Sequence, residues 1–246
     1  MGIVETFIAS LFFALIFLFV GRLEGPLGFS RRRVMSAAAG VSVAYVFIRM
    51  LPELGEAGAV FVRETAQRQL PFPELRIYSS ALLGFIFFYG LSHLVKWSEI
   101  SGRKNAPDYG SGDPVFLLHI GGFAVYSWLV TYLMLRGITE TPLPILLYAL
   151  AMGLHFLGVG HSLEHEHGRL YKRPGRQILA AAVMAGWLCG VFADVPKPVI
   201  ITLLGFVSGG VVMNSMIMEL PSEKEGKFWA LATGAVGYAL LLFLVR

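Results

Sequence analysis

Charged residues are scarce in this sequence. They make up 15% of its 246 residues, whereas 56% are hydrophobic. An average globular protein has a charged share of roughly 25%, and a soluble chain of this size would leave too much apolar surface in water. The composition and the long apolar runs exclude an ordinary soluble domain. They predict a multi-pass membrane protein with the lipid bilayer as its surroundings.

Cysteine is almost absent as well. The single Cys189 excludes an internal disulfide and says little about the redox compartment. The formal net charge of +4 does not indicate nucleic-acid binding, because the basic residues of a membrane protein mainly mark the loops that face the cytoplasm. We therefore expect no nucleic-acid partner.

Eight apolar segments have about the 20 residues that a helix needs to cross a bilayer. Pro196 and Pro198 oppose a merger of the sixth and seventh segments into one helix. The sequence thus predicts an all-α polytopic membrane protein, with one transmembrane domain over residues 1–246. Its eight transmembrane helices are expected near 3–21, 34–52, 77–95, 114–135, 142–161, 177–193, 197–218 and 228–245.

The distribution of Lys and Arg predicts the orientation of these helices. With the N-terminus outside, the inner loops hold thirteen basic residues and the outer segments hold six. Because cytoplasmic loops carry the excess of Lys and Arg, we expect a cell-membrane protein with both termini outside the cytoplasm. The first apolar run has no basic region before it, which indicates a first span and not a removed signal peptide.

Two segments of the sequence resemble each other. "GVSVAYVFIRMLPELGE" begins at Gly40 and "GGVVMNSMIMELPSEKE" begins at Gly209, and they align without a gap from the glycine to the Leu-Pro pair and the acidic ending. The two segments run in opposite directions through the membrane, which is typical of an inverted repeat. We therefore expect a 3+2+3 arrangement of repeat unit 1–95, central helices 114–161 and repeat unit 177–246. Chance recurrence of common membrane residues is the alternative.

The same segments carry a family resemblance. "IRMLPELGE" closes the second span, and "IMELPSE" with "FWALATGAVGYALLLFLV" covers the last two spans. With eight spans and outside termini, the chain resembles the ZIP (Zrt/Irt-like) family of divalent-metal transporters. The resemblance implies transport of zinc or another divalent transition metal. It implies no organic cofactor and no enzyme activity, and it leaves a homodimer open.

The ZIP resemblance also points to two candidate metal ligands. The family pattern is His-Asn-x-x-Asp-Gly on the fourth span and His-Glu-x-Pro-His or Glu on the fifth. His119 in "HIGGFA" and His155 in "HFLGV" match the leading histidines. The carboxylate positions of the pattern are Phe123 and Phe156, so two imidazoles remain without an acidic partner.

Depth in the membrane supports a shared site for these two histidines. His119 lies about 7–8 Å from the inner start of its helix at Pro114. His155 lies about 20 Å from the outer start at Pro142, which leaves about 10 Å of a 30 Å bilayer core. The two imidazoles are therefore predicted at similar depth, as a metal-binding pair. A pair of neutral, hydrogen-bonded histidines is the alternative.

A second group of candidate ligands follows at the end of the fifth span. His161 and His165 are four residues apart and share a helix face, with Glu164 beside them. This group, with His167, predicts a weak cytoplasmic exit site for the metal. His-x-x-Glu-His also matches a metalloprotease pattern, and a solvated helix end without an ion is the third interpretation.

Four further residues are candidates for lining a transport path. Tyr45 and Asn214 occupy matching positions of the repeat. Ser127 could complete a metal's ligand shell, and Glu219 lies near the inner end of the seventh span. A transporter of divalent cations is the function predicted first. The alternatives are a ZIP-fold membrane protein without metal transport and an intramembrane metal-dependent hydrolase.

Overall fold

The computed structural model describes residues 2–22, 31–68, 70–102, 110–136, 145–218 and 227–244. Within these ranges the chain is helical and contains no β-strand. The helices and helical turns are α1 (Ile3–Phe19), η1 (Val20–Arg22), α2 (Arg31–Tyr45), η2 (Val46–Met50), α3 (Leu51–Thr65), η3 (Ala66–Arg68), α4 (Pro73–Ile100), α5 (Pro114–Arg136), α6 (Ile145–His167), η5 (Tyr171–Gly175), α7 (Arg176–Phe192), α8 (Lys197–Met213), η6 (Asn214–Met218) and α9 (Phe228–Leu244).

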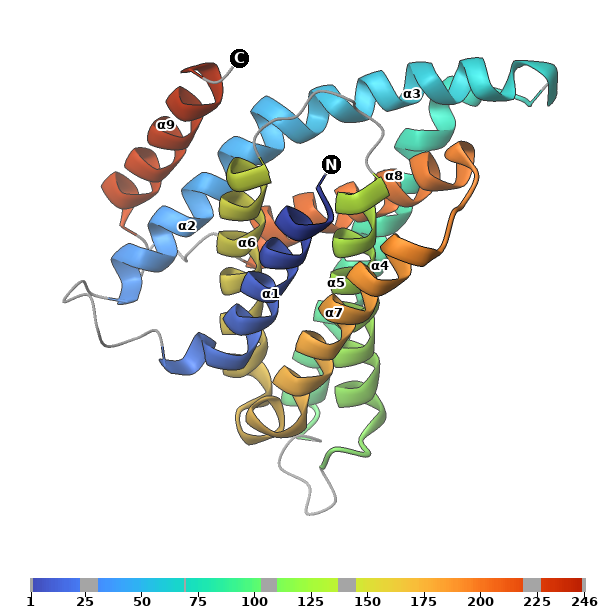
Figure 1. Ribbon diagram of the computed structural model, residues 1–246. Helices are drawn as coiled ribbons and strands as arrows, with labels where there is room; N and C mark the ends of the chain where they lie inside the picture. The colour runs from blue at the N-terminus through green and yellow to red at the C-terminus, as the bar shows by residue number, and fades with distance from the viewer. Residues whose placement is uncertain are drawn as a thin grey trace.

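The apolar runs of the sequence explain most of these helices. Seven helical segments in the described ranges are long and apolar enough to cross a membrane, and α9 is a shorter apolar helix of 17 residues. The predicted all-α, multi-span class is therefore supported by length and composition. The ends of α1 and α6 and the starts of α5 and α7 lie together at the bottom of Figure 1, and both termini lie in its upper part.

The second predicted span is part of a longer helix than expected. α2, η2 and α3 follow one another without a break, and Figure 1 shows them as one rod that runs obliquely across the molecule. Pro52 lacks the N–H for the helical hydrogen bond and would clash with the carbonyl of Ile48 in a regular α-helix. The π-helical turn η2 widens the helix at that carbonyl. The helix therefore passes the proline and continues to Thr65.

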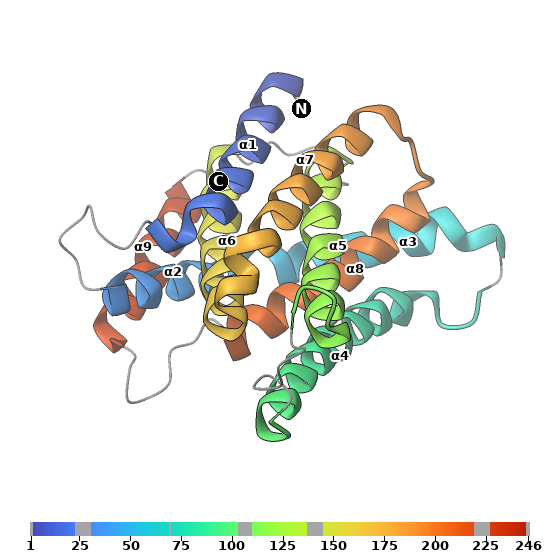
Figure 2. The ribbon, with the colours of Figure 1, turned by 90° about the horizontal axis from the view of Figure 1, so that it is seen from below.

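Among the helix crossings that depend on glycine, two use corresponding positions. α9 lies beside α2, and α4 packs against α8 (Figures 1 and 2). A Cβ atom at Gly40 of α2 would overlap the carbonyl oxygen of Leu231, and one at Gly234 of α9 would overlap that of Ala37. These two helices can approach so closely only because both contact positions lack a side chain.

The second crossing repeats the first at matching positions. A Cβ atom at Gly209 of α8 would overlap the carbonyl oxygen of Ala81, and one at Gly84 of α4 would overlap that of Phe206. Gly209 and Phe206 each lie 169 positions after their counterparts Gly40 and Ala37 in the first crossing. Similarly, Leu231 and Gly234 each lie 150 positions after Ala81 and Gly84.

Candidate metal centre

Three side chains from two neighbouring helices converge at the end of the bundle. Each of His119, Glu166 and His167 offers a ligand atom, and these atoms all lie within 4.8 Å of one another. His119 Nδ1 is 2.8 Å from His167 Nε2 and 3.4 Å from Glu166 Oε2. In the described part of the chain, this is the one set of three such residues with that spacing.

The ends of two helices position these ligands. His119 lies in the second turn of α5, and Glu166 and His167 close α6. Gly168 has a positive φ of 53°, the backbone conformation that commonly ends a helix. The helix therefore stops directly after His167, at the level of the first turns of α5.

Aromatic rings shield the two imidazoles from water. The Phe116 ring meets His167 edge to face at 5.2 Å between centroids, and the Phe123 ring meets His119 in the same way. His119 and His167 are 1% and 5% exposed, whereas the Glu166 side chain is 19% exposed. The carboxylate thus lies on the more open side of the cluster.

Two imidazoles and a carboxylate are a suitable ligand set for a divalent transition metal. With bonds of about 2.0–2.1 Å, two tetrahedral nitrogen ligands lie about 3.3 Å apart. The 2.8 Å between His119 Nδ1 and His167 Nε2 is a hydrogen-bond distance, so an ion would have to separate these nitrogens by about 0.5 Å. A fourth position would stay open for water.

His155 has a different set of neighbours. Its Nε2 lies 2.7 Å from the Tyr126 hydroxyl, and its Nδ1 lies 3.5 Å from the Ser215 hydroxyl. Tyr126 is seven residues beyond His119 on α5, about 10 Å along the helix axis. The sequence predicted His119 and His155 as one metal pair. In the structure His119 contacts His167, whereas His155 contacts Tyr126, about 10 Å further along α5. The reason is that α6 extends to His167, six residues beyond its predicted end.

Three residues of the predicted exit site, His161, Glu164 and His165, have different neighbours and different exposure. Glu164 pairs with Lys172 at 3.3 Å between Oε1 and Nζ. His165 is exposed and His161 is half-buried. In the described ranges these residues do not form a set of three converging ligand atoms, and their role in holding an ion stays a prediction. Of the predicted group, His167 belongs to the cluster with His119, and Glu166, which the sequence analysis did not single out, joins it. The signal for this was Gly168, which marks the end of the helix.

Three of the four candidate path residues lie in the core. Tyr45 is buried and packs edge to face against Tyr148. Ser127 is buried and donates to the carbonyl of Phe123 within its own helix, at 2.8 Å. Asn214 is fully buried, and neither amide atom has a hydrogen-bond partner among the described residues. Glu219 lies outside the described residues.

The Asn214 amide leads to a testable expectation. A buried amide without a partner costs about 1–3 kcal/mol, so Asn214→Leu is expected to unfold in detergent at the same temperature as the parent or higher. Tyr126→Phe is the comparison, because it removes the hydrogen bond to His155 and should lower the stability by about 1 kcal/mol. A destabilised Asn214→Leu variant would mean that the amide makes a stabilising interaction.

Aromatic rings fill the two positions at which the ZIP resemblance would predict carboxylates. Phe123 and Phe156 are both fully buried and lie in the hydrophobic core of the bundle. Phe156 contacts Phe13 and Tyr126 edge to face. No carboxylate occupies these two positions, and the acidic group of the cluster comes from Glu166 at the end of α6.

Comparisons with protein-family models, with curated proteins and with solved structures found no match for this chain.

Proposed function

We propose that the chain is a ZIP-like transporter of a divalent transition-metal cation, with zinc as the first candidate. The observation that carries the proposal is the convergence of His119, Glu166 and His167. A double positive charge is costly to hold in a low-dielectric interior without a counter-charge. Glu166 supplies a negative charge at the site. The carboxylates that accompany the leading histidines in the ZIP pattern are replaced here by Phe123 and Phe156.

The proposal includes eight membrane spans in a 3+2+3 arrangement of inverted repeats. The two glycine crossings support it, since α2 against α9 and α8 against α4 use residues at constant offsets of 169 and 150 positions. The π-helical turns support it as well. η2 begins six residues after Gly40, and η6 begins five residues after Gly209, so the two turns differ by one residue in the alignment of the repeats. Such repeats allow a transporter to open alternately to its two sides.

The ligand set lies where a cation would leave or enter on the inner side. The Lys and Arg distribution assigns the start of α5 and the end of α6 to the cytoplasm. His119 and His167 would bind the ion through Nδ1 and Nε2, and Glu166, being more exposed, would bind it or release it to water. Asn214 and the His155–Tyr126 pair are the polar groups deeper in the bundle that the ion would pass.

A ZIP-fold membrane protein without metal transport is the second candidate. The observation that favours it is the replacement of the two family carboxylates by buried Phe123 and Phe156. In that case the His119–His167 contact is a structural hydrogen bond that joins α5 to α6. The protein would then bind metal weakly or not at all.

Uptake by proteoliposomes distinguishes the two functions. The parent chain, His119→Ala and Glu166→Gln are each reconstituted into liposomes that enclose a zinc-sensitive dye. His93→Ala is the control, because the His93 side chain is exposed and lies outside the predicted metal sites. We expect uptake by the parent and by His93→Ala, and a loss of at least tenfold, about 1.4 kcal/mol, in the other two variants. If the parent takes up no metal, or if His119→Ala takes it up normally, the transport proposal is wrong.

A further inference from the structure

A pocket of about 190 Å³ lies beside the end of α6, on the opposite face from the cluster of His119, Glu166 and His167. Its walls are the last residues of α1 with η1, Glu164 of α6, and the connection from α6 to α7. Glu164 and Glu166 are two residues apart and therefore about 200° apart around the helix. The end of α6 thus presents one carboxylate to α5 and another to this pocket.

The pocket carries an excess of positive charge. Arg22, Lys172 and Arg176 line it, and Glu164 is its one acidic residue, which gives a net charge of +2. Lys172 already pairs with Glu164. Among the described residues, neither arginine has a carboxylate partner.

The Arg176 guanidinium has hydrogen-bonding capacity that the described residues do not use. Its Nη1 donates to the carbonyl of Leu18 at 3.3 Å, and its Nε is buried with no hydrogen-bond partner among the described residues. The Arg22 guanidinium lies 5.7 Å from the Phe19 ring centroid, and the residue is exposed. A guanidinium binds a phosphate through two parallel N–H···O bonds.

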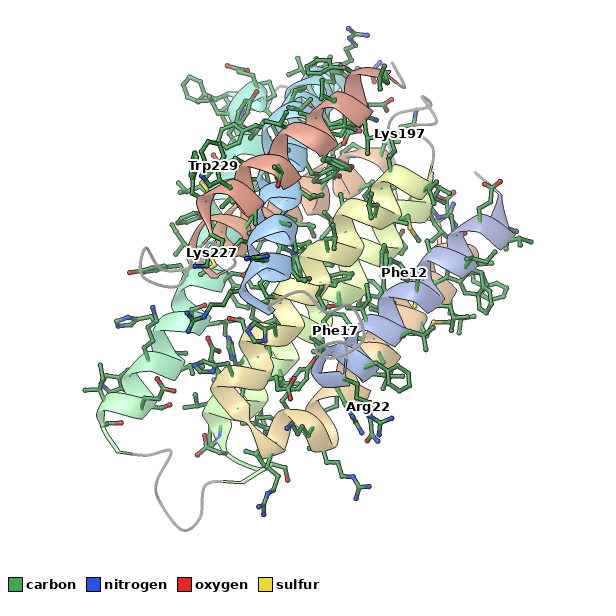
Figure 3. All side chains as sticks on the ribbon, turned by 90° about the vertical axis from the view of Figure 1, so that its left-hand side faces the viewer. Phe12, Phe17, Arg22, Lys197, Lys227 and Trp229 are labelled. Atoms are coloured by element: carbon green, nitrogen blue, oxygen red, sulfur yellow. The ribbon has the colours of Figure 1, made fainter. Side chains whose placement is uncertain are left out.

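The depth of the pocket matches that of a phospholipid headgroup. Arg22 lies 19 residues beyond the start of α1 at Ile3, about 29 Å along the helix and so close to one bilayer core thickness. Figure 3 shows Arg22 at the end of α1 and Phe17 within the bundle. Phe17, Leu18 and Val20 give the pocket an apolar wall beside the cations, which suits a phosphate that is attached to a glycerol and acyl chains.

We propose that this pocket binds a phosphate group, either the headgroup phosphate of an anionic phospholipid or inorganic phosphate. The proposal does not depend on metal transport, because none of the pocket residues belongs to the His119–Glu166–His167 cluster. Basic pockets between helices at the cytoplasmic side are a known type of site for anionic headgroups.

The test measures ligand-induced thermal stabilisation of the full chain in detergent. The probes are dioctanoyl phosphatidylglycerol, dioctanoyl phosphatidylcholine and inorganic phosphate, each titrated separately. We expect phosphatidylglycerol to raise the unfolding midpoint, and phosphatidylcholine to do so more weakly. If inorganic phosphate alone gives the same rise at a similar concentration, the ligand is free phosphate. If only the lipid raises the midpoint, the ligand is a headgroup.

Substitutions of the charged residues that line the pocket test whether the ligand binds there. Arg176→Gln and Arg22→Gln should each weaken binding about tenfold, and Glu164→Gln should strengthen it, because the carboxylate repels an anion. Lys197→Gln, at the opposite end of the molecule (Figure 3), is the matched control and should bind as the parent does. Arg22 is exposed, so its variant stays informative if Arg176→Gln fails to fold. The proposal is overturned if no probe stabilises the parent, if both arginine variants bind normally, or if Glu164→Gln weakens binding.

Discussion

Gly209→Ala is expected to unfold in detergent at a temperature well below that of the parent. We expect its stability to fall by about 3 kcal/mol, the upper end of the usual cost of adding a methyl group to a well-packed core. The new methyl group would overlap the carbonyl oxygen of Ala81. Because that neighbour is backbone and not the end of a flexible side chain, α4 and α8 must move apart as whole helices. The measurement is the fraction of monodisperse protein on size exclusion after heating.

Gly90→Ala is the matched control on the same helix pair. Gly90 lies on α4 with open space around its Cβ position, and alanine there gains up to about 1 kcal/mol of helix propensity over glycine. If the two variants unfold at the same temperature, the close crossing of α4 and α8 is absent in the protein. Gly40→Ala should show the same loss as Gly209→Ala, with Gly237→Ala on α9 as its control, because Gly40 holds the corresponding place in the other crossing.

Zinc affinity is expected to fall at least about 100-fold in His119→Ala, in His167→Ala and in Glu166→Gln. Mutation of residues that only hydrogen-bond to metal ligands already lowers metal affinity about 10–100-fold, and loss of a ligand should lower it further. His155→Ala is the decisive comparison. Its imidazole bonds to Tyr126 and Ser215, and Tyr126 lies about 10 Å along α5 from His119. The zinc affinity of His155→Ala should therefore stay near that of the parent. Isothermal titration of each purified variant in detergent gives the values.

A different outcome of this series would restore the pairing predicted from the sequence. If His155→Ala weakens binding as much as His119→Ala while His167→Ala binds normally, the ion lies between His119 and His155. If the parent binds no zinc at all, the three side chains form a structural hydrogen-bonded group and the metal proposal fails.

The sequence predicted the helices better than their ends. The apolar runs determined where α1, α5, α7 and α9 form, because a bilayer-length apolar segment satisfies its backbone only as a helix. The ends depend on local exceptions. Pro52 normally stops a helix, but the π turn before it lets α2 continue into α3. α6 was predicted to end near residue 161, whereas it runs to His167 and ends at Gly168.

That difference in one helix end explains what was missed at the candidate site. His119 was predicted as a ligand from a motif, which depends only on residue order. Its partners depend on the register of α6 against α5, and a six-residue error in the end of α6 amounts to about 9 Å. The estimate of equal depth therefore selected His155, while the structure brings His167 and Glu166 to His119. Register between two helices comes from their packing, and a hydrophobic run does not encode it.

The glycine crossings also have a consequence for the order in which the protein assembles on the ribosome. The position on α9 that faces Gly40 is Leu231, which is 191 residues downstream, whereas Gly209 follows its partner Ala81 by 128 residues. At synthesis rates of about 5–20 residues per second, α2 waits about 10–40 s for its partner and α4 waits about 6–26 s. During that time each of these glycine contact positions lacks its partner helix. α1 packs on α6 and α7 and can do so before α8 and α9 are made, whereas the interface of α2 with α9 must wait for the last described helix.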